Sequence, residues 1–156
     1  MKNVKNLAIF VLMTIFTLGV FSCDDDDNEP LPGYKKVEAD RFKANIESSK
    51  RNGTPQIIDY RSPEEYKAGH IEDAVNIYVT DKNAEKEIKA ALTQFDQNRN
   101  IYVYGSEKTN NTLGFYLAGI VSGQGWGEGR TFDLLGGFES WEAAGYPIVT
   151  EGETQQ

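Results

Sequence analysis

The stretch IYVYGSEKTNNTLGFYLAGIV, residues 101–121, decides the fold of this chain. It begins with four β-branched and aromatic residues at 101–104, which predict a buried strand. Apolar residues then recur at helical spacing from Leu113 to Val121, which predicts a helix. The loop between them, residues 105–111, therefore lies at the carboxyl end of a strand and at a helix N-terminus. Open α/β sheets usually bind ligands at such a place.

This loop carries no cysteine and no histidine. It consists of Gly105, Ser106, Glu107, Lys108, Thr109, Asn110 and Asn111. A hydroxyl on Ser106 or Thr109 needs a neighbouring base before it can act as a nucleophile. Two interpretations stay open: a binding loop whose free amides attract an anion, or a plain connection whose Asn and Thr side chains cap the helix.

Composition limits the function classes. The chain has 156 residues, of which 39% are hydrophobic and 26% charged, as expected for one globular domain. Its formal net charge of -8 would repel nucleic acid, so no nucleic-acid partner is expected. Cys23 is the single cysteine and His70 the single histidine. We therefore expect no intrachain disulfide, no metal site built on several thiolates or histidines, and no cofactor.

Residues 1–22 have the pattern of a secretory signal peptide. Lys2 and Lys5 precede an apolar run from Leu7 to Val20, which is shorter than the roughly 20 residues that span a bilayer as a helix. The run ends in a small residue directly before Cys23, which resembles the lipobox of bacterial lipoproteins. The resemblance implies lipidation of Cys23, and an uncleaved membrane anchor is the alternative. In both cases the membrane is a partner of the chain.

Residues 23–33 are predicted to be an acidic tether. Four aspartates at 24–27 repel one another and have no apolar face to bury. An acidic run beside a lipidated cysteine resembles the export signal of Bacteroidetes lipoproteins. It implies an outer-membrane protein of the cell envelope that faces outward, with a periplasmic position as the alternative. Residues 34–150 are then the folded domain, and residues 151–156 are a polar tail.

Strand and helix patterns alternate through the domain. Strands are predicted at 34–39, 56–60, 74–78, 101–104 and 132–135, and helices at 40–50, 62–69, 84–95 and 138–144. Asp40 and Ser62 are the expected N-caps of the first two helices. This alternation predicts a parallel α/β sheet covered on both faces. The glycine-rich stretch 122–130 is predicted to be mobile and to expose Trp126 as a contact for a protein partner, whereas Trp141 is predicted to be core.

Two segments resemble the hallmarks of rhodanese-like domains. IIDYRSPEEYKAGHIEDAVNI at 57–77 is similar to the first hallmark of the family, and LLGGFESWEAAGYPIV at 134–149 to its closing signature. The resemblance covers about residues 34–150 and implies a five-stranded parallel sheet with helices on both faces. In the family, the strand matching 101–104 is followed by a catalytic cysteine. Here Gly105 stands at that position, and Lys108 and Asn110 replace the usual Gly and Arg.

The missing cysteine bears directly on activity. The family's thiolate takes a sulfane sulfur and passes it to a nucleophile, and no residue of this loop can replace a thiolate. Cys23 lies before the domain and cannot substitute. The resemblance therefore implies a non-catalytic binding or scaffolding module, whose loop still attracts a small anion or an acidic peptide group. Asp59 and Arg61 are expected to support the loop through an ion pair, and His70 to be structural.

An enzyme remains the alternative. One version is a sulfurtransferase-related protein that uses the thiol of a partner. Another is a hydrolase in which Ser106 or Thr109 is activated by His70 or Asp59 within hydrogen-bond reach.

Overall fold

The computed structural model describes residues 33–78, 84–108 and 117–150. Its centre is a single five-stranded sheet in the order β1-β5-β4-β2-β3, in which all neighbouring strands are parallel. The strands are β1 (Lys35–Val37), β2 (Gln56–Asp59), β3 (Ala74–Asn76), β4 (Ile101–Tyr104) and β5 (Thr131–Leu134). The prediction of a parallel five-stranded sheet is confirmed.

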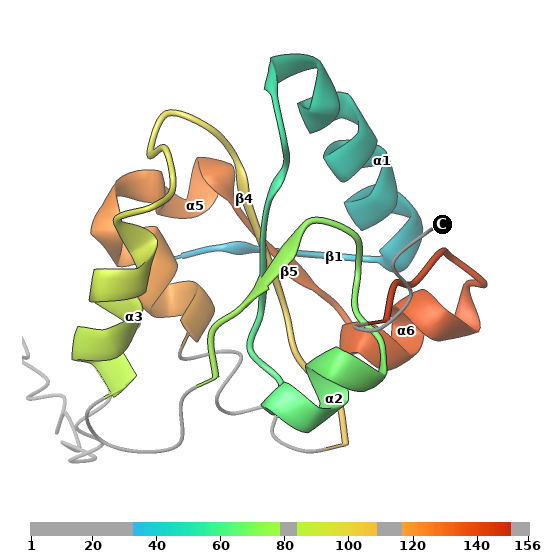
Figure 1. Ribbon diagram of the computed structural model, residues 1–156. Coiled ribbons are helices and arrows are strands. Elements are labelled where there is room, and N and C mark those ends of the chain that lie inside the picture. Colours follow the sequence, from blue (N-terminus) through green and yellow to red (C-terminus); the bar gives the residue numbers. More distant parts are fainter. Residues whose placement is uncertain (1–32, 79–83, 109–116, 151–156) are drawn as a thin grey trace, which may run out of the picture.

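Helices cover both faces of this sheet. They are α1 (Ala39–Ser49), η1 (Lys50–Asn52), α2 (Pro63–Ala68), α3 (Ala84–Leu92), η2 (Ser122–Trp126), α5 (Gly127–Arg130) and α6 (Gly137–Ala143), and residues 117–121 are also helical. Figure 1 shows α3 and α5 on one side of the sheet and α1 and α6 on the other. Among the described residues, no helix combines the length and the apolar character needed to cross a membrane.

Alternation along the central strands separates two hydrophobic cores. Ile58 and Val103 face one core, which α3, residues 117–121 and Trp126 complete. Ile57 and Tyr102 face the other core, which is completed by α1 and α6. Because side chains alternate between the faces of a strand, β2 and β4 can be buried on both sides, as their positions inside the sheet require. Among the described residues, the fully buried members of both cores lie within 39–141.

The helix after β2 begins as its sequence predicts. Ser62 is the N-cap of α2, and its hydroxyl accepts a hydrogen bond from the Glu65 amide. The Glu65 carboxylate accepts one from the Ser62 amide in return, which completes a capping box with Pro63 at the first helical position. The prediction for Asp40 is wrong. The chain leaves β1 directly into α1, so Glu38 is the N-cap and Asp40 lies in the first turn.

The glycine-rich stretch also differs from its prediction. Residues 122–130 form η2, which is interrupted by Gly125 at a φ of 115°, and then α5. The glycines let the chain turn where other residues would be strained, and Trp126 packs into the first core with 3% of its surface exposed. The prediction that Trp126 is an exposed contact is therefore wrong, whereas Trp141 is core as predicted, at 4% exposure.

Candidate functional site

The candidate site lies at one edge of the sheet, where β2, β4 and β5 end side by side. Because these strands are parallel and adjacent, the segments that follow them, starting at Tyr60, Gly105 and Leu135, meet at the same edge. The Phe138 amide donates a 2.7 Å hydrogen bond to the Gly105 carbonyl, which ties the start of α6 to the loop after β4. Gly137 is required at this contact. A Cβ there would lie 2.6 Å from the Gly105 oxygen.

Asp59 and Arg61 form a buried, fully bonded ion pair at the end of β2. The Asp59 carboxylate accepts from the Arg61 backbone amide at 2.8 Å and from Arg61 Nη2 at 2.6 Å. The same Nη2 donates to the Gly69 carbonyl at 2.6 Å, and the guanidinium lies 3.7 Å from the ring centroid of Phe138. Each charge has its partner within the protein. The pair therefore fastens β2 to the end of α2 and to α6.

His70 is bonded to Tyr66 and has no hydrogen bond to residues 105–108, the described part of the loop after β4. Its Nδ1 lies 2.9 Å from the Tyr66 carbonyl oxygen, and its ring is stacked on the Tyr66 ring at a centroid distance of 3.8 Å. Asp59 is likewise committed to Arg61. The hydrolase alternative predicted that His70 or Asp59 would be the base for a loop hydroxyl. Neither residue is bonded to Ser106. The other candidate hydroxyl, that of Thr109, lies outside the described residues.

A different carboxylate reaches Ser106. Ser106 Oγ donates a 2.5 Å hydrogen bond to Glu139 Oε1, and the Glu107 amide donates to Glu139 Oε2 at 3.0 Å. Partial burial raises the pKa of Glu139, but these hydrogen bonds and the charge of Lys108 outweigh it, so the pKa is lower than usual. The carboxylate of α6 therefore occupies the place where the loop was expected to receive an external anion.

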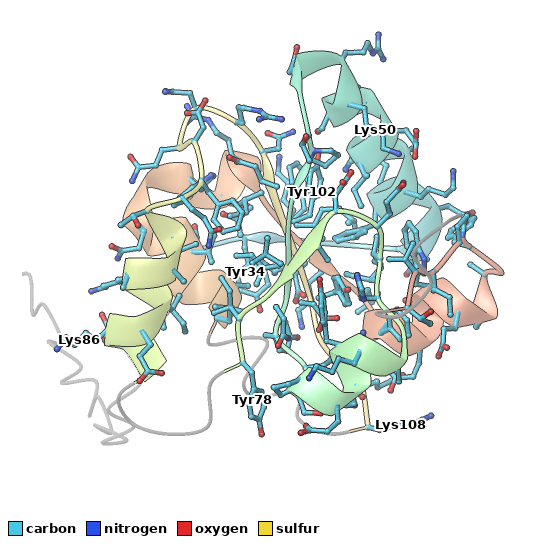
Figure 2. All side chains as sticks on the ribbon, viewed as in Figure 1. Tyr34, Lys50, Tyr78, Lys86, Tyr102 and Lys108 are labelled. Carbon is cyan, nitrogen blue, oxygen red and sulfur yellow. The ribbon has the colours of Figure 1, made fainter. Side chains whose placement is uncertain are left out.

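The described part of the loop has no free amide at its tip. The Lys108 amide donates to Ser106 Oγ at 3.2 Å, so the amides of Glu107 and Lys108 both have internal acceptors. The Lys108 side chain points away from the body of the molecule (Figure 2). For residues 105–108 the prediction of an open anion cradle is wrong, because α6 supplies its own anion. The other predicted loop residues, Thr109, Asn110 and Asn111, lie outside the described residues.

Tyr60 fills the space above Gly105. A Cβ built on Gly105 would overlap the Tyr60 ring, so no larger residue fits at this position unless the tyrosine moves. Burial raises the pKa of the Tyr60 hydroxyl well above its usual value, and the nearby Asp133 carboxylate raises it further. The tyrosine therefore stays neutral and takes up the room that a side chain at position 105 would need.

A small cavity of about 80 Å³ lies beside this tyrosine. It is lined by residues from the ends of four strands, namely Lys36, Tyr60, Ser106, Glu107 and the segment from Asp133 to Gly137. Asp133 is only 6% exposed, and burial raises its pKa to about 7 although the positive charge of Lys36 opposes this shift. The cavity therefore contains a carboxyl group that titrates near neutral pH.

Three residues of this site, Asp133, Glu139 and Tyr60, were not singled out from the sequence. Asp133 carried the one available signal, a charged residue inside a predicted buried strand at 132–135. The contact between Ser106 and Glu139 joins residues that lie 33 positions apart, and local patterns contain no information about it. The overlap of Tyr60 with position 105 likewise depends on the pairing of β2 with β4.

The sequence and the fold agree with a known family. The sequence model of the Rhodanese-like domain matches residues 38–144, and the chain belongs to this family. No curated protein matches the chain.

Solved structures show the same fold. A rhodanese-related protein from Thermoplasma volcanium is similar with a TM-score of 0.56 and 22% identity, over 76% of this chain and 100% of that chain. The rhodanese-like domain of the Alr3790 protein from Anabaena has a TM-score of 0.56 and 21% identity, over 78% and 83%. A thiosulfate sulfurtransferase from Pseudomonas aeruginosa has a TM-score of 0.54 and 18% identity, over 77% of this chain but only 20% of the longer protein.

Proposed function

We propose that this chain is a rhodanese-like module that lacks sulfurtransferase activity and acts by binding or scaffolding. The observation that carries the proposal is the filling of the pocket at the end of β4. Gly105 offers no thiol, and the Tyr60 ring occupies the space into which a side chain at that position would project. A sulfur carrier needs a thiolate at an accessible position, and none of the described residues is a cysteine.

The proposal places the module on the cell envelope. Lipidation of Cys23 and the acidic residues that follow it would hold the domain on a tether at the outer membrane, facing outward. The described domain is acidic in composition and has no basic motif for nucleic acid. Its role would then be to hold a partner or a small ligand at the membrane surface.

The proposal can be tested with residues 24–156, which contain all described strands and both cores. We would assay sulfur transfer from thiosulfate to cyanide for the parent protein, for Gly105→Cys, and for Gly105→Cys combined with Tyr60→Ala. The parent is expected to be inactive because it has no thiolate. Gly105→Cys alone is expected to be inactive and less stable, because the new side chain overlaps the Tyr60 ring. Transfer by the parent would contradict the proposal.

The double variant separates two reasons for inactivity. If it reacts with a thiol reagent and transfers sulfur, the rest of the pocket is competent and Tyr60 is the obstacle. If it reacts with the reagent but transfers nothing, the occupied amides of Glu107 and Lys108 leave nothing to bind the sulfur donor. Tyr60→Ala alone is the matched control, because it opens the same space without adding a thiol.

Hydrolysis is a second candidate function. The 2.5 Å hydrogen bond from Ser106 Oγ to Glu139 Oε1 joins a hydroxyl to a carboxylate, as in a nucleophile and base pair. Two features weigh against it: the lowered pKa of Glu139 makes it a poor proton acceptor, and the Glu107 amide is not free to stabilise an oxyanion. Hydrolysis of p-nitrophenyl acetate that disappears in Ser106→Ala but not in the exposed Ser48→Ala would favour it.

A further inference from the structure

The cavity beside Tyr60 is lined by a buried carboxyl group for which the described residues provide no hydrogen bond. Asp133 is more than nine-tenths buried, and no hydrogen bond or ion pair among the described residues involves its carboxylate. A buried carboxylate without partners is costly, and in native proteins such a group asks for an explanation. Asp133 lines the cavity, so a molecule that enters it meets this carboxylate.

The surroundings of the cavity are acidic rather than basic. Tyr34 and Tyr60 both have pKa values raised by burial and by the charge of Asp133, and Glu139 adds to the shift at Tyr60. Tyr34 packs against the first core. Glu107 lies on the cavity wall. Lys36 is the basic residue of the lining, and its charge does not bring the pKa of Asp133 back to its usual range. An anion is therefore disfavoured here and a cation favoured.

The size and donor set of the cavity restrict which cation fits. A volume of about 80 Å³ holds only a few non-hydrogen atoms. Within the described ranges, no three His, Cys, Asp or Glu side chains are grouped as metal ligands, so a hard metal ion would lack its ligands. An ammonium group needs fewer charged ligands than a metal ion. One carboxylate and a few hydroxyl oxygens satisfy its three N–H donors, and the Tyr60 ring offers an aromatic wall.

We propose that this cavity binds a protonated primary amine, with the Asp133 carboxylate as its ion-pair partner and the hydroxyl groups of Tyr60 and Ser106 as further acceptors. Two sources share this chemistry: a free small amine, and the ammonium end of a lysine side chain on a partner protein. The inference deepens the proposed function, because it names the ligand class of the binding module. The proposed function and the amine site are tested by different results. Sulfur transfer by the parent protein would contradict only the proposed function, and absence of amine binding would contradict only the amine site.

The test is a nuclear magnetic resonance titration of ¹⁵N-labelled residues 24–156 at constant ionic strength. Methylammonium chloride represents the free amine, N-acetyl-lysine methylamide represents the lysine side chain, and sodium thiosulfate is the anion comparison. Methylammonium is expected to shift the amides around Asp133 and Gly136. A shift with both amines supports a lysine side chain as the source, whereas a shift with methylammonium alone supports a free amine.

Two substitutions are expected to change amine affinity in opposite directions. Asp133→Asn is expected to weaken amine binding at least tenfold, because it removes the ion-pair partner. Lys36→Gln is expected to tighten amine binding several-fold, because it removes the competing positive charge. Glu142→Gln, an exposed position on α6, changes the net charge by the same amount as Asp133→Asn and should leave binding unchanged. Unfolding curves of each variant confirm that the comparison is made on folded protein.

Dependence on pH adds an independent readout. The amine pairs with ionised Asp133, whose pKa is about 7, so affinity should rise about tenfold between pH 6 and pH 8. This rise should vanish in Asp133→Asn. The proposal is overturned if neither amine shifts the cavity amides at pH 8, or if Asp133→Asn binds the amines as tightly as the parent does. It is also overturned if thiosulfate binds in the cavity and Lys36→Gln weakens thiosulfate binding. The last result would identify an anion site.

Discussion

Asp59 and Asp133 are two buried carboxylates at the same edge of one sheet, and the protein treats them differently. Asp59 is fully buried and has a bidentate arginine partner and a backbone amide. Asp133 is nearly as buried, yet within the described residues its carboxylate has no bonded partner. The first charge is neutralised inside the fold and fastens β2 to its neighbours. The second lines a cavity, where we propose that it pairs with an amine. Equal burial therefore does not imply an equal role.

The strongest way to break this comparison is to remove the partner of Asp59. Arg61→Met should destabilise the protein by roughly 3–5 kcal/mol, because it leaves a buried carboxylate unpaired. Urea unfolding of residues 24–156 measures the effect. Adding Asp59→Asn to Arg61→Met should restore part of the loss, and Arg41→Met on the exposed face of α1 is the matched control. A loss below about 1 kcal/mol would mean that the pair is not a structural fastening.

The opposite result is expected at Asp133. Its folded-state pKa of about 7 lies above the value of about 3.9 in an unfolded chain, so the unfolded state releases its proton first as pH rises. This group therefore makes the parent less stable as pH rises from about 4 to 7. Asp133→Asn lacks this loss and should be more stable than the parent by roughly 4 kcal/mol at pH 8, with little difference at pH 4.

Unfolding of both proteins at several pH values between 4 and 8 measures this difference. Comparing the variant with the parent removes the contribution of Glu139. The lowered pKa of that residue acts in the other direction, because its stabilisation is lost as pH falls. Equal pH profiles for parent and variant would show that Asp133 is satisfied in a way that its surroundings do not indicate.

The smallest expected effect sharpens the description of the Asp59 region. Ser62→Ala removes the hydroxyl that accepts from the Glu65 amide and should cost about 1 kcal/mol. The C-terminal end of α2 is held by the hydrogen bond from Arg61 to the Gly69 carbonyl, so the effect of Ser62→Ala should stay local. Hydrogen exchange should therefore become faster in α2 and not in α6. Ser48→Ala in α1 serves as the control. Uniformly faster exchange across both helices would indicate a global loss of stability instead of a local one.

The sequence predicted those parts of the molecule that depend on neighbours along the chain. The β-branched run at 101–104 and the Ser62, Pro63, Glu65 pattern are local signals, and both elements form as expected. The Asp59–Arg61 pair is also local, since only one residue lies between its members. The strand patterns predicted five strands, and the family resemblance implied the same number.

What the sequence did not predict depends on contacts between distant segments. Glu139 reaches Ser106 only because α6 packs against the loop after β4, and this contact replaces the expected external anion. Trp126 illustrates the other failure. A glycine-rich composition suggests a stretch without packing side chains, but the same glycines permit the turns that bury the indole.

The overlap of Tyr60 with position 105 has a consequence for how this protein can change. A larger residue at 105 collides with the ring, and a smaller residue at 60 opens a void beside a glycine. Each single substitution therefore passes through a destabilised protein, while the two together restore a filled site. The two positions are therefore coupled, and a side chain at position 105 is accommodated best when residue 60 becomes smaller in the same protein.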